Sequence, residues 1–490
     1  LFRSSTEPLT MNIRQTLWVA IWAVGIAGCA KGPAEDSLPA PGKHADAAAN
    51  RWIHSQMKDQ YLYNDHIARL RITTQSYEQS CESFFLSLLS SSPDDNDGKH
   101  TEGRDYFYST MERGNTSKAA SFGGDSYGIE FKLYTYPDNE SYGAARVMYV
   151  VEGSPADRAG IRRGDWIRQV NGRDISFGST NVLVRGGQAR MLVQRIAYSV
   201  PGLVYDVTWE KEVVVDAAEP VAYNPVLTDT VIVRGTHRIG YLAYTSFDTG
   251  PQGPSAGDHA YDEALKAVFA EFARNRIDEL VLDLRYNPGG YISCCQLLSS
   301  LIAGESRLGE SFCYYRYNTG QETELKFLGR NEVGGATVDL QRLYVLTGPW
   351  TASASELLIS ALKPYMPLRL IGTRTEGKNV GSYEIRSDTY ALTLHPITLQ
   401  LLNKEHWTDY AAGFMPDIYL NDDANQDQMR ELGDPEEYLL SQALAEIVGS
   451  ESAASKAVAG SSAGPFGPVA DAPSHLNRVQ GAIAGNEAQN

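Results

Sequence analysis

Cysteine is scarce in this sequence, and the few cysteines present have no spacing that would build a site. Five occur among 490 residues. Apart from Cys29 they are Cys81, Cys294, Cys295 and Cys313, and no pair has the C-x-x-C spacing of a zinc ligand set. These four allow three disulfide pairings, but a chain this long needs no disulfide framework, so we expect small buried apolar side chains. The nine histidines include no H-E-x-x-H, which leaves a zinc peptidase without support.

Positive charge is also in short supply. The chain has 43 Lys and Arg against 60 Asp and Glu, for a net charge of -17. Proteins that bind nucleic acid need clustered basic residues to neutralise phosphates, so we expect no nucleic-acid partner. The composition, 42% hydrophobic and 21% charged, is that of an ordinary globular protein with room for two or three domains.

The apolar run near the start, residues 17–27, is too short to cross a membrane, since a spanning helix takes about 20 residues. It follows the basic Arg14 and ends in Ile26-Ala27-Gly28-Cys29, the pattern of a signal peptide. The end resembles a bacterial lipobox, which implies that Cys29 is lipidated. We therefore expect a lipid-anchored protein of the bacterial cell envelope, on the periplasmic or outer-membrane face. The alternative is an ordinary signal peptide that contains a cysteine.

Composition and periodicity predict a multidomain α/β protein. Apolar residues at helical spacing, such as Trp52, Ile53 and Met57, indicate helices from about residue 50 to 112. Short strands follow, and then strands alternate with helices, which is typical of α/β layers. The predicted parts are a signal peptide with lipobox (1–28), a linker (29–48), a helical N-terminal domain (49–118), a β-rich domain (119–216), an α/β domain (217–449) and a disordered tail (450–490).

An acidic segment, residues 94–98, has the letters D-D-N-D-G and hints at a calcium loop. Aligning Gly98 with the obligatory glycine of such a loop puts Pro93 at the first ligand position and Arg104 at the last. Neither residue can bind calcium there, so we predict a solvated acidic loop and no metal site.

The β-rich domain contains a helix signal with clear ends. Ser154 can cap the helix, Pro155 suits its first turn, and Gly160 can take the left-handed position after its end. Together with Gly164-Asp165 and the turn Asn171-Gly172, this string resembles PDZ domains of processing proteases. The resemblance makes Gly128, Ile129, Glu130 and Phe131 the carboxylate-binding loop and the strand after it, where a peptide's C-terminal region adds to the sheet edge. The alternative for Gly128 is a plain turn before a strand.

Three segments carry the candidate chemistry. The first is L-D-L-R-Y-N-P-G-G at residues 282–290, where glycines let the backbone approach a ligand and aim amides at an anion. The second is T-A-S-A-S-E at residues 351–356, at the start of an expected helix, and the third is T-E-G-K at residues 375–378. In this order, and with the family's own spacing between Ser353 and Lys378, they resemble peptidase family S41, the C-terminal processing peptidases. The resemblance covers about residues 120–440 and implies a ClpP/crotonase-like α/β catalytic domain.

The resemblance implies that Ser353 is the nucleophile and Lys378 its base. A lysine can take the serine proton only when neutral, so it must sit where burial favours the uncharged amine. The amides of Ala354 and Gly289 are the implied oxyanion hole, with Glu356 and Thr375 in supporting positions. No cofactor is implied.

Two features of the motif leave alternatives open. Ser353-x-x-Glu356 is itself a capping box, so Ser353 could be a helix cap only, and Ser355 is the second-choice nucleophile. Family members with a Ser-Lys-Gln arrangement have glutamine four residues after the lysine, whereas this chain has Ser382, a candidate lysine-orienting hydroxyl.

The sequence therefore predicts a secreted serine endopeptidase with a Ser-Lys dyad and an acyl-enzyme mechanism, acting on proteins or peptides with exposed C-terminal regions. The main alternative is a non-catalytic, peptide-binding lipoprotein scaffold. A third hypothesis, a penicillin-interacting acyltransferase, rests on S-x-x-K matches that no K-T-G follows. The oligomeric state stays open.

Overall fold

The computed structural model describes residues 43–92, 95, 97–101, 104–114, 124–136, 139–176, 180–200, 204–422, 429–449, 467–468 and 482–483. The expected signal peptide, Cys29 and most of the expected tail lie outside these residues. Within the described residues no helix is long and apolar enough to cross a membrane.

The N-terminal region is part helix and part strand. It contains α1 (Lys43–Gln60), α2 (Asn64–Arg69), a 3-10 turn (Gln75–Glu78) and α3 (Cys81–Leu86), followed by the hairpin β1 (Gly98–Thr101) and β2 (Arg104–Phe107) and by β3 (Thr110–Arg113). Two expectations are therefore wrong: α1 begins inside the expected linker, and residues 98–101, 104–107 and 110–113 form strands and not helix. The strands owe their conformation to pairing, because β3 runs antiparallel to β21 (Leu392–His395) of the following α/β domain.

This region has no core of its own. Ile53, Phe84 and Phe85 pack in one cluster with Val380 and Leu394 of the α/β domain. The helical periodicity seen in the sequence is thus an apolar face that is buried against strands formed much further along the chain.

Residues 124–220 form a β-rich unit around a small core. Its main sheet contains β5 (Ile129–Tyr136), β6 (Asn139–Val150), β7 (Trp166–Val170), β8 (Arg173–Ser176), β9 (Ala189–Val200) and β10 (Val204–Val215), in the order β10-β9-β7-β8-β6-β5, with β24 (Gly467–Pro468) beyond β5. A short strand, β4 (Asp125–Ser126), pairs with β11 (Glu219–Pro220). The expected helix is α4 (Pro155–Arg158), capped by Ser154 Oγ, which accepts the Asp157 N–H at 3.3 Å.

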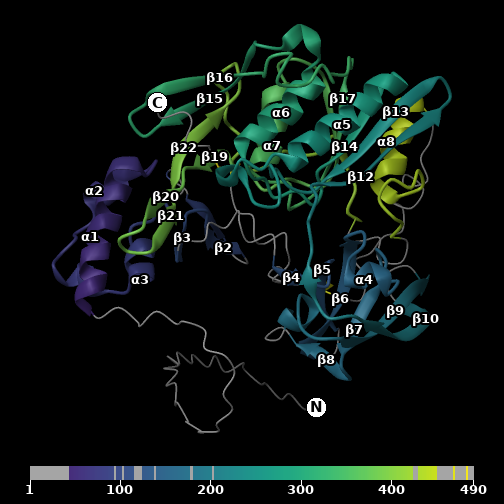
Figure 1. The fold of residues 1–490 in the computed structure, drawn as a ribbon, viewed down its shortest axis with the longest axis horizontal. Coiled ribbons are helices and arrows are strands. Elements are labelled where there is room, and N and C mark those ends of the chain that lie inside the picture. Colours follow the sequence, from purple (N-terminus) through teal and green to yellow (C-terminus); the bar gives the residue numbers. More distant parts are fainter. Residues whose placement is uncertain are drawn as a thin grey trace, which may run out of the picture. The chain divides into compact units, whose positions relative to one another are not determined.

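The α/β domain is built on a six-stranded sheet. Its strands are β12 (Val226–Arg234), β13 (His237–Tyr244), β14 (Glu279–Asp283), β17 (Leu343–Thr347), β18 (Leu368–Gly372) and β23 (Ile418–Tyr419), in that order and parallel from β13 onward. Helices α5 (Ala260–Asn275), α6 (Ile292–Ala303) and α7 (Ala354–Leu362) share one core with it, and α8 (Tyr438–Val448) packs in another (Figure 1). Successive side chains of a strand point to opposite faces of the sheet, and this explains why there are two cores. Leu282 joins the first core and its neighbour Val281 joins the second.

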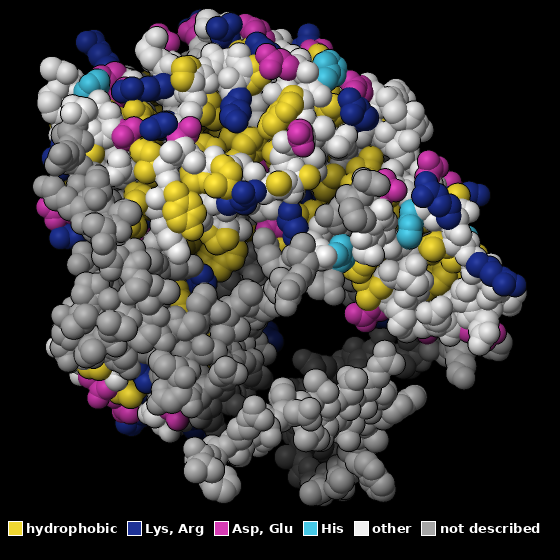
Figure 2. All heavy atoms as spheres, turned by 180° about the vertical axis from the view of Figure 1, so that it is seen from behind, with side chains coloured by type: hydrophobic (Ala, Val, Ile, Leu, Met, Phe, Trp, Pro, Cys, Tyr) yellow, Lys and Arg dark blue, Asp and Glu magenta, His cyan; other side chains and the backbone are white. Residues whose placement is uncertain are grey.

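A second sheet completes this domain. It contains β16 (Glu322–Lys326), β15 (Ser311–Tyr317), β22 (Ile397–Leu402), β19 (Val380–Ser382) and β25 (Ala482–Ile483), in that order, while β20 (Ile385–Ser387) and β21 join β3. The multidomain α/β fold predicted from the sequence is confirmed. Cys81, Cys294, Cys295 and Cys313 are buried and unpaired. On the face in Figure 2, the coloured Lys and Arg side chains are interspersed with Asp, Glu and hydrophobic ones.

The shared N-terminal core gives a stability prediction. Phe84 is fully buried in α3, whereas Leu86, two residues on, is 44% exposed. We expect Phe84→Ala to lower the free energy of unfolding by about 3–5 kcal/mol, since it deletes a buried aromatic and leaves a cavity. Leu86→Ala should change it by less than about 1 kcal/mol. Denaturant titration of both variants tests this, and equal losses would contradict the burial of this face.

Candidate active site

Ser353 lies where the loop after β17 turns into α7. Its side chain is fully buried, and its φ of 58° and ψ of -111° are rare for a residue with a side chain. The Ser353–Glu356 pair has the form of a capping box. Within it, Ser353 Oγ has no hydrogen-bond partner among the described residues. The backbone conformation of Ser353 is more strained than a helix cap requires.

The carboxylate of Glu356 binds several groups of the site. It accepts hydrogen bonds from the Ser353 N–H at 3.0 Å, the Lys378 N–H at 2.8 Å and the Gly377 N–H at 2.6 Å. It also accepts from Thr375 Oγ1 at 2.6 Å. Burial raises the pKa of Glu356 to about 7, against the hydrogen bonds, which lower it. One buried side chain therefore fixes the backbone of the candidate nucleophile to the backbone of the candidate base.

Thr375 is the second part of this arrangement. Its hydroxyl oxygen accepts the Phe414 N–H at 2.7 Å while donating to Glu356. The loop that carries Lys378 is thus tied both to α7 and to the chain around Phe414. Gly377, with φ of 95°, lies so close to Ala411 that a Cβ would meet its carbonyl oxygen at 2.3 Å.

Lys378 is buried, with 3% of its surface exposed, and its amine is covered by the N-terminal region. Lys378 Nζ lies 4.6 Å from the centre of the Tyr108 ring. The Tyr108 hydroxyl donates to Glu376 at 3.1 Å, and the Tyr106 hydroxyl donates to the same oxygen at 2.5 Å. The hydroxyl groups of Tyr106 and Tyr108 therefore both bind the loop that carries the candidate base.

Asp97 supports this cover, and its burial corrects the expectation of a solvated acidic loop. The side chain is fully buried and accepts from the Tyr108 and Ser109 N–H groups at 3.1 and 2.9 Å and from the Tyr61 hydroxyl at 2.8 Å. Burial raises the pKa of Asp97, and hydrogen bonds and the charge of Lys378 lower it. Nothing in the sequence pointed to Tyr108 or Asp97 as site residues, because their role depends on a contact with residues far along the chain.

The glycine turn lies directly against Ser353. Gly289 has φ of 106°, and a Cβ there would stand 2.9 Å from the Cβ of Ser353 and 3.1 Å from the Ala354 nitrogen. The Gly289 N–H donates to Asn287 Oδ1 at 2.9 Å, so it is engaged within the turn in this structure. The Ala354 N–H belongs to the first turn of α7, where helix amides have no partner within the helix.

The remaining predicted residues of this site have other surroundings. Ser355 Oγ donates to the Asn287 carbonyl at 2.9 Å, so the second-choice nucleophile serves as a brace for the turn. Ser382 is buried in β19, in register with Ile397 of β22 and with Ile483 of β25.

The predicted peptide-binding residues lie at the start of β5. Gly128 has φ of 77°, and a Cβ there would meet Ser154 Cβ at 2.2 Å, so only glycine fits. Its N–H donates to Ser126 Oγ at 3.0 Å. Ile129 and Phe131 point into the core of the β-rich unit, and Glu130 between them is also buried.

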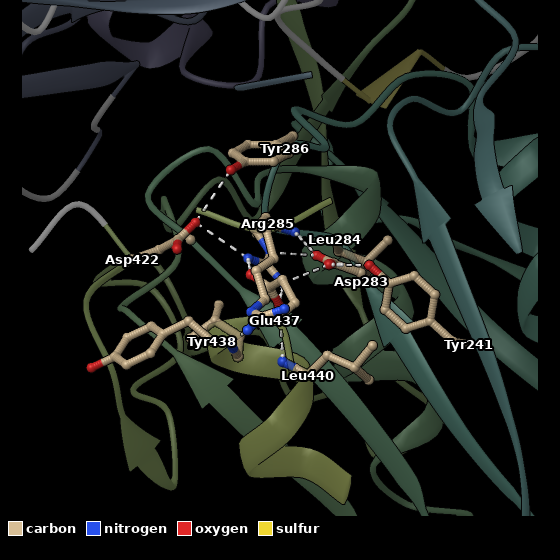
Figure 3. Close-up of polar contacts among 12 residues, drawn as sticks. Tyr241, Asp283, Leu284, Arg285, Tyr286, Asp422, Glu437, Tyr438 and Leu440 are labelled. Carbon is tan, nitrogen blue, oxygen red and sulfur yellow. Dashed lines mark hydrogen bonds and ion pairs between the residues drawn. The ribbon is translucent and has the colours of Figure 1, made fainter. Parts of the chain in front are cut away.

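A buried ionic cluster around Arg285 lies just before the glycine turn and includes Arg163 of the β-rich unit. Arg285 donates to both oxygens of Glu437 at 2.6 and 2.9 Å and lies against Asp283 and Asp422 (Figure 3). Arg163 of the β-rich unit donates to the Tyr286 hydroxyl at 2.6 Å and approaches Asp422 at 3.3 Å. Since Arg285 and Tyr286 immediately precede the turn, the β-rich unit takes part in holding it.

The positive and negative charges of this buried cluster compensate one another. Burial alone would raise the pKa of Asp422, but the charges of Arg285 and Arg163 lower it to about 2. Glu437 also accepts the Leu439 and Leu440 N–H groups and so caps α8. Neither Arg163 nor Glu437 was predicted to take part in a site, because neither lies in one of the motifs identified in the sequence.

Comparison with known families gives three matches along the chain. The model of peptidase family S41 matches residues 238–420, a PDZ domain model matches residues 146–195, and the model of the peptidase S41 N-terminal domain matches residues 48–112. The three matches cover most of the α/β domain, about half of the β-rich unit, and the helical region with its hairpin.

Relatives and solved structures agree with these matches. The chain is 26% identical over 274 residues to carboxyl-terminal-processing peptidase 1 of Arabidopsis thaliana chloroplasts, covering 54% of this chain and 50% of that protein. It is 25% identical over 299 residues to a carboxyl-terminal-processing protease of Synechocystis, covering 60% and 62%. The chain thus spans half to three fifths of these relatives. A solved structure named as an S41 protease, from Bacteroides fragilis, is 29% identical with a TM-score of 0.70, covering 81% of this chain and 97% of that one.

The ionic cluster gives a stability prediction with a neighbouring control. Arg163→Ala should lower the free energy of unfolding by about 3–5 kcal/mol, because it leaves buried carboxylates short of a cation. Arg162→Ala, which removes an exposed pair with Asp157, should cost less than about 1 kcal/mol. Urea titration of both variants measures the difference.

The same cluster predicts a pH dependence. The folded pKa of Asp422, about 2, is below its ordinary value of 3.8, so its stabilisation is present above about pH 4 and is lost as the pH falls through about 2. Equal losses of unfolding free energy in Arg162→Ala and Arg163→Ala would contradict the role of the cluster. So would a loss in Arg163→Ala that is the same at pH 2 as at neutral pH.

Proposed function

This chain is a member of peptidase family S41, and on that premise we propose that it is a serine endopeptidase of the carboxyl-terminal processing type that uses Ser353 as nucleophile and Lys378 as base. The observation that carries the proposal is the Glu356 carboxylate, which binds the backbone N–H groups of both residues. A structural helix cap has no reason to be tied to a lysine loop that lies beyond the next strand of the sheet.

The reaction begins with proton transfer. Lys378 takes the proton from Ser353 Oγ as the oxygen attacks the carbonyl carbon of the scissile bond. The proton then passes to the leaving amine as the C–N bond breaks, which leaves an acyl-enzyme ester on Ser353. Lys378 next takes a proton from a water molecule, whose oxygen attacks the ester carbon. As the bond to Ser353 Oγ breaks, Lys378 gives that proton to Oγ, which restores the serine and the neutral amine and releases the new carboxyl group.

Two features favour the charge changes in this sequence. The Ala354 N–H and the positive end of α7 stabilise the negative charge on the tetrahedral oxygen. Gly289 supplies the second donor when the oxyanion replaces Asn287 Oδ1 as the acceptor of its N–H. The ring of Tyr108, 4.6 Å from Lys378 Nζ, covers one side of the amine and so limits where it can lie.

Substrate choice and location complete the proposal. The PDZ domain binds an exposed C-terminal region of a protein or peptide, which adds as a strand at β5 beside Gly128. Ser382 accepts a hydrogen bond from the Lys378 amine in place of the glutamine of other family members. From the sequence we also propose that Cys29 carries a lipid that anchors the protein in the bacterial cell envelope. No scaffold function explains why Ser353 is held in a strained conformation, so we do not favour one.

The dyad is tested by removing each member. Ser353→Ala and Lys378→Ala should each lower kcat/KM for an unstructured protein substrate by at least about 1,000-fold, because each removes an essential atom of the proton transfer. Ser355→Ala should keep most of the activity, since its hydroxyl braces the turn only. A serine-directed phosphonate probe should add its mass to the wild-type chain and not to Ser353→Ala. Full proteolysis by either dyad variant would refute the assignment.

The role of Glu356 is tested by an isosteric change. In Glu356→Gln one acceptor oxygen becomes an NH2 group that faces backbone donors. Loss of a hydrogen bond to a charged group costs about 1.5–3 kcal/mol, so we expect kcat to fall by roughly 10- to 100-fold with a smaller change in KM. Glu405→Gln, an exposed change in the same domain, is the control and should have wild-type rates. Wild-type kcat in Glu356→Gln would show that the carboxylate does not position the dyad.

A further inference from the structure

Asn287, the residue that opens the glycine turn, has a hydrogen-bond partner for each of its polar groups. It is fully buried. Its backbone N–H donates to the Leu284 carbonyl at 3.0 Å, and its Nδ2 donates to the Tyr244 carbonyl, at the end of β13, also at 3.0 Å. Its Oδ1 accepts the Gly289 N–H, and its carbonyl accepts two donors from residues 352–355. A buried polar group with all its partners is held in one position.

The carbonyl of Asn287 binds the chain on either side of the candidate nucleophile. It accepts the Ala352 N–H at 3.1 Å and the Ser355 hydroxyl at 2.9 Å. These two residues directly precede and follow the pair Ser353 and Ala354 in the sequence. The segment that carries the nucleophile and the first oxyanion donor is therefore fixed to Asn287 at both of its ends.

The side chain of Asn287 binds the second oxyanion donor. The Gly289 N–H donates to Asn287 Oδ1 at 2.9 Å. The next part of the turn is held by backbone bonds, since the Phe247 N–H donates to the Gly289 carbonyl at 2.9 Å and the Tyr291 N–H donates to the Phe247 carbonyl at 2.7 Å. A Cβ on Gly289 would stand 3.1 Å from the Ala354 nitrogen, so the two donor segments are in contact.

We propose that Asn287 is a positioning residue that sets the spacing of the two oxyanion donors, Gly289 and Ala354. This inference rests on the proposed function. Oδ1 keeps the Gly289 N–H satisfied while no substrate is bound and releases it to the oxyanion. The bonds from Nδ2 to Tyr244 and from residues 352–355 to the Asn287 carbonyl persist and hold both donors in place. Donors fixed in advance need no reorganisation when the negative charge develops, and this is the source of their effect on rate.

Replacement of Asn287 tests this role in the reaction. Asn287→Leu keeps the size of the side chain and removes both of its hydrogen bonds. Since the charge develops only in the transition state, we expect kcat to fall by roughly 100-fold, the effect of losing one oxyanion donor, with KM within about 3-fold of wild type. In Asn287→Ser the hydroxyl still accepts the Gly289 N–H but is too short to reach Tyr244 as well, so kcat should fall by about 10-fold.

Asn403 provides a matched control in the same domain. It is also buried, its Nδ2 donates to the Ser360 carbonyl at 3.3 Å, and its Oδ1 accepts the Glu405 and Trp407 N–H groups at 2.9 and 3.1 Å. None of these bonds reaches the glycine turn or Ser353. Asn403→Leu should lower the free energy of unfolding, as Asn287→Leu does, but should leave kcat within about 3-fold of wild type.

A peptide boronate separates positioning from a general loss of structure. Its boron binds Ser353 Oγ in a tetrahedral adduct that mimics the transition state, whereas the matching peptide amide binds as a ground state. Asn287→Leu should bind the boronate roughly 100-fold more weakly than wild type and the peptide amide within about 3-fold.

The outcomes of the boronate measurement also separate this inference from the dyad. Equal weakening of boronate and peptide amide in Asn287→Leu and Asn287→Ser, or an unchanged affinity for the boronate, would overturn the role of Asn287 alone. A wild-type chain that forms no boronate adduct would overturn the assignment of Ser353 and this inference with it.

Discussion

The buried carboxylate of Glu356 is the interaction on which the rest of the site depends. Ser353 enters α7 and Lys378 lies in the loop after β18, and one backbone hydrogen bond, from the Glu376 N–H to the Thr351 carbonyl at 3.0 Å, joins the two loops. Glu356 joins them by accepting from both backbones, from Gly377 and from Thr375. In a buried setting an acceptor with several donors is well satisfied, and the loss of the carboxylate would leave those donors without a partner.

Around this centre, two other parts of the chain complete what the α/β domain begins. The N-terminal region contributes Tyr108 over the Lys378 amine and is itself held by a core shared with β21 and β22. The PDZ domain contributes Arg163 to the charges beside Tyr286 and Arg285, just before the glycine turn. The proposed site is therefore supported by three domains, so changes far from Ser353 in sequence are able to alter the geometry around it.

Motif order and residue type allowed much of this to be predicted. The helix that begins after Ser353 is as predicted, because its first residues form a capping-box pattern that marks its start. The helical assignment was wrong for residues 98–101 and 104–113, since β1 and β2 pair with each other and β3 pairs with β21. The segment around Asp97 was predicted to be a solvated loop because it fails as a calcium loop, whereas hydrogen bonds with Tyr61 and Tyr108 hold the buried Asp97 side chain.

By itself, the sequence determined which chemical groups are available and their order: a glycine pair, then a serine at a helix start, then a lysine in a later loop. Local preferences are enough for this, since caps, turns and apolar periodicity act over short stretches of chain. Only the tertiary structure decided that Gly289 packs on Ser353, that Tyr108 covers Lys378 and that Glu356 binds both backbones. These contacts join residues that are distant in the sequence, and they form only when burial of the shared core outweighs the conformational entropy lost in closing such long loops.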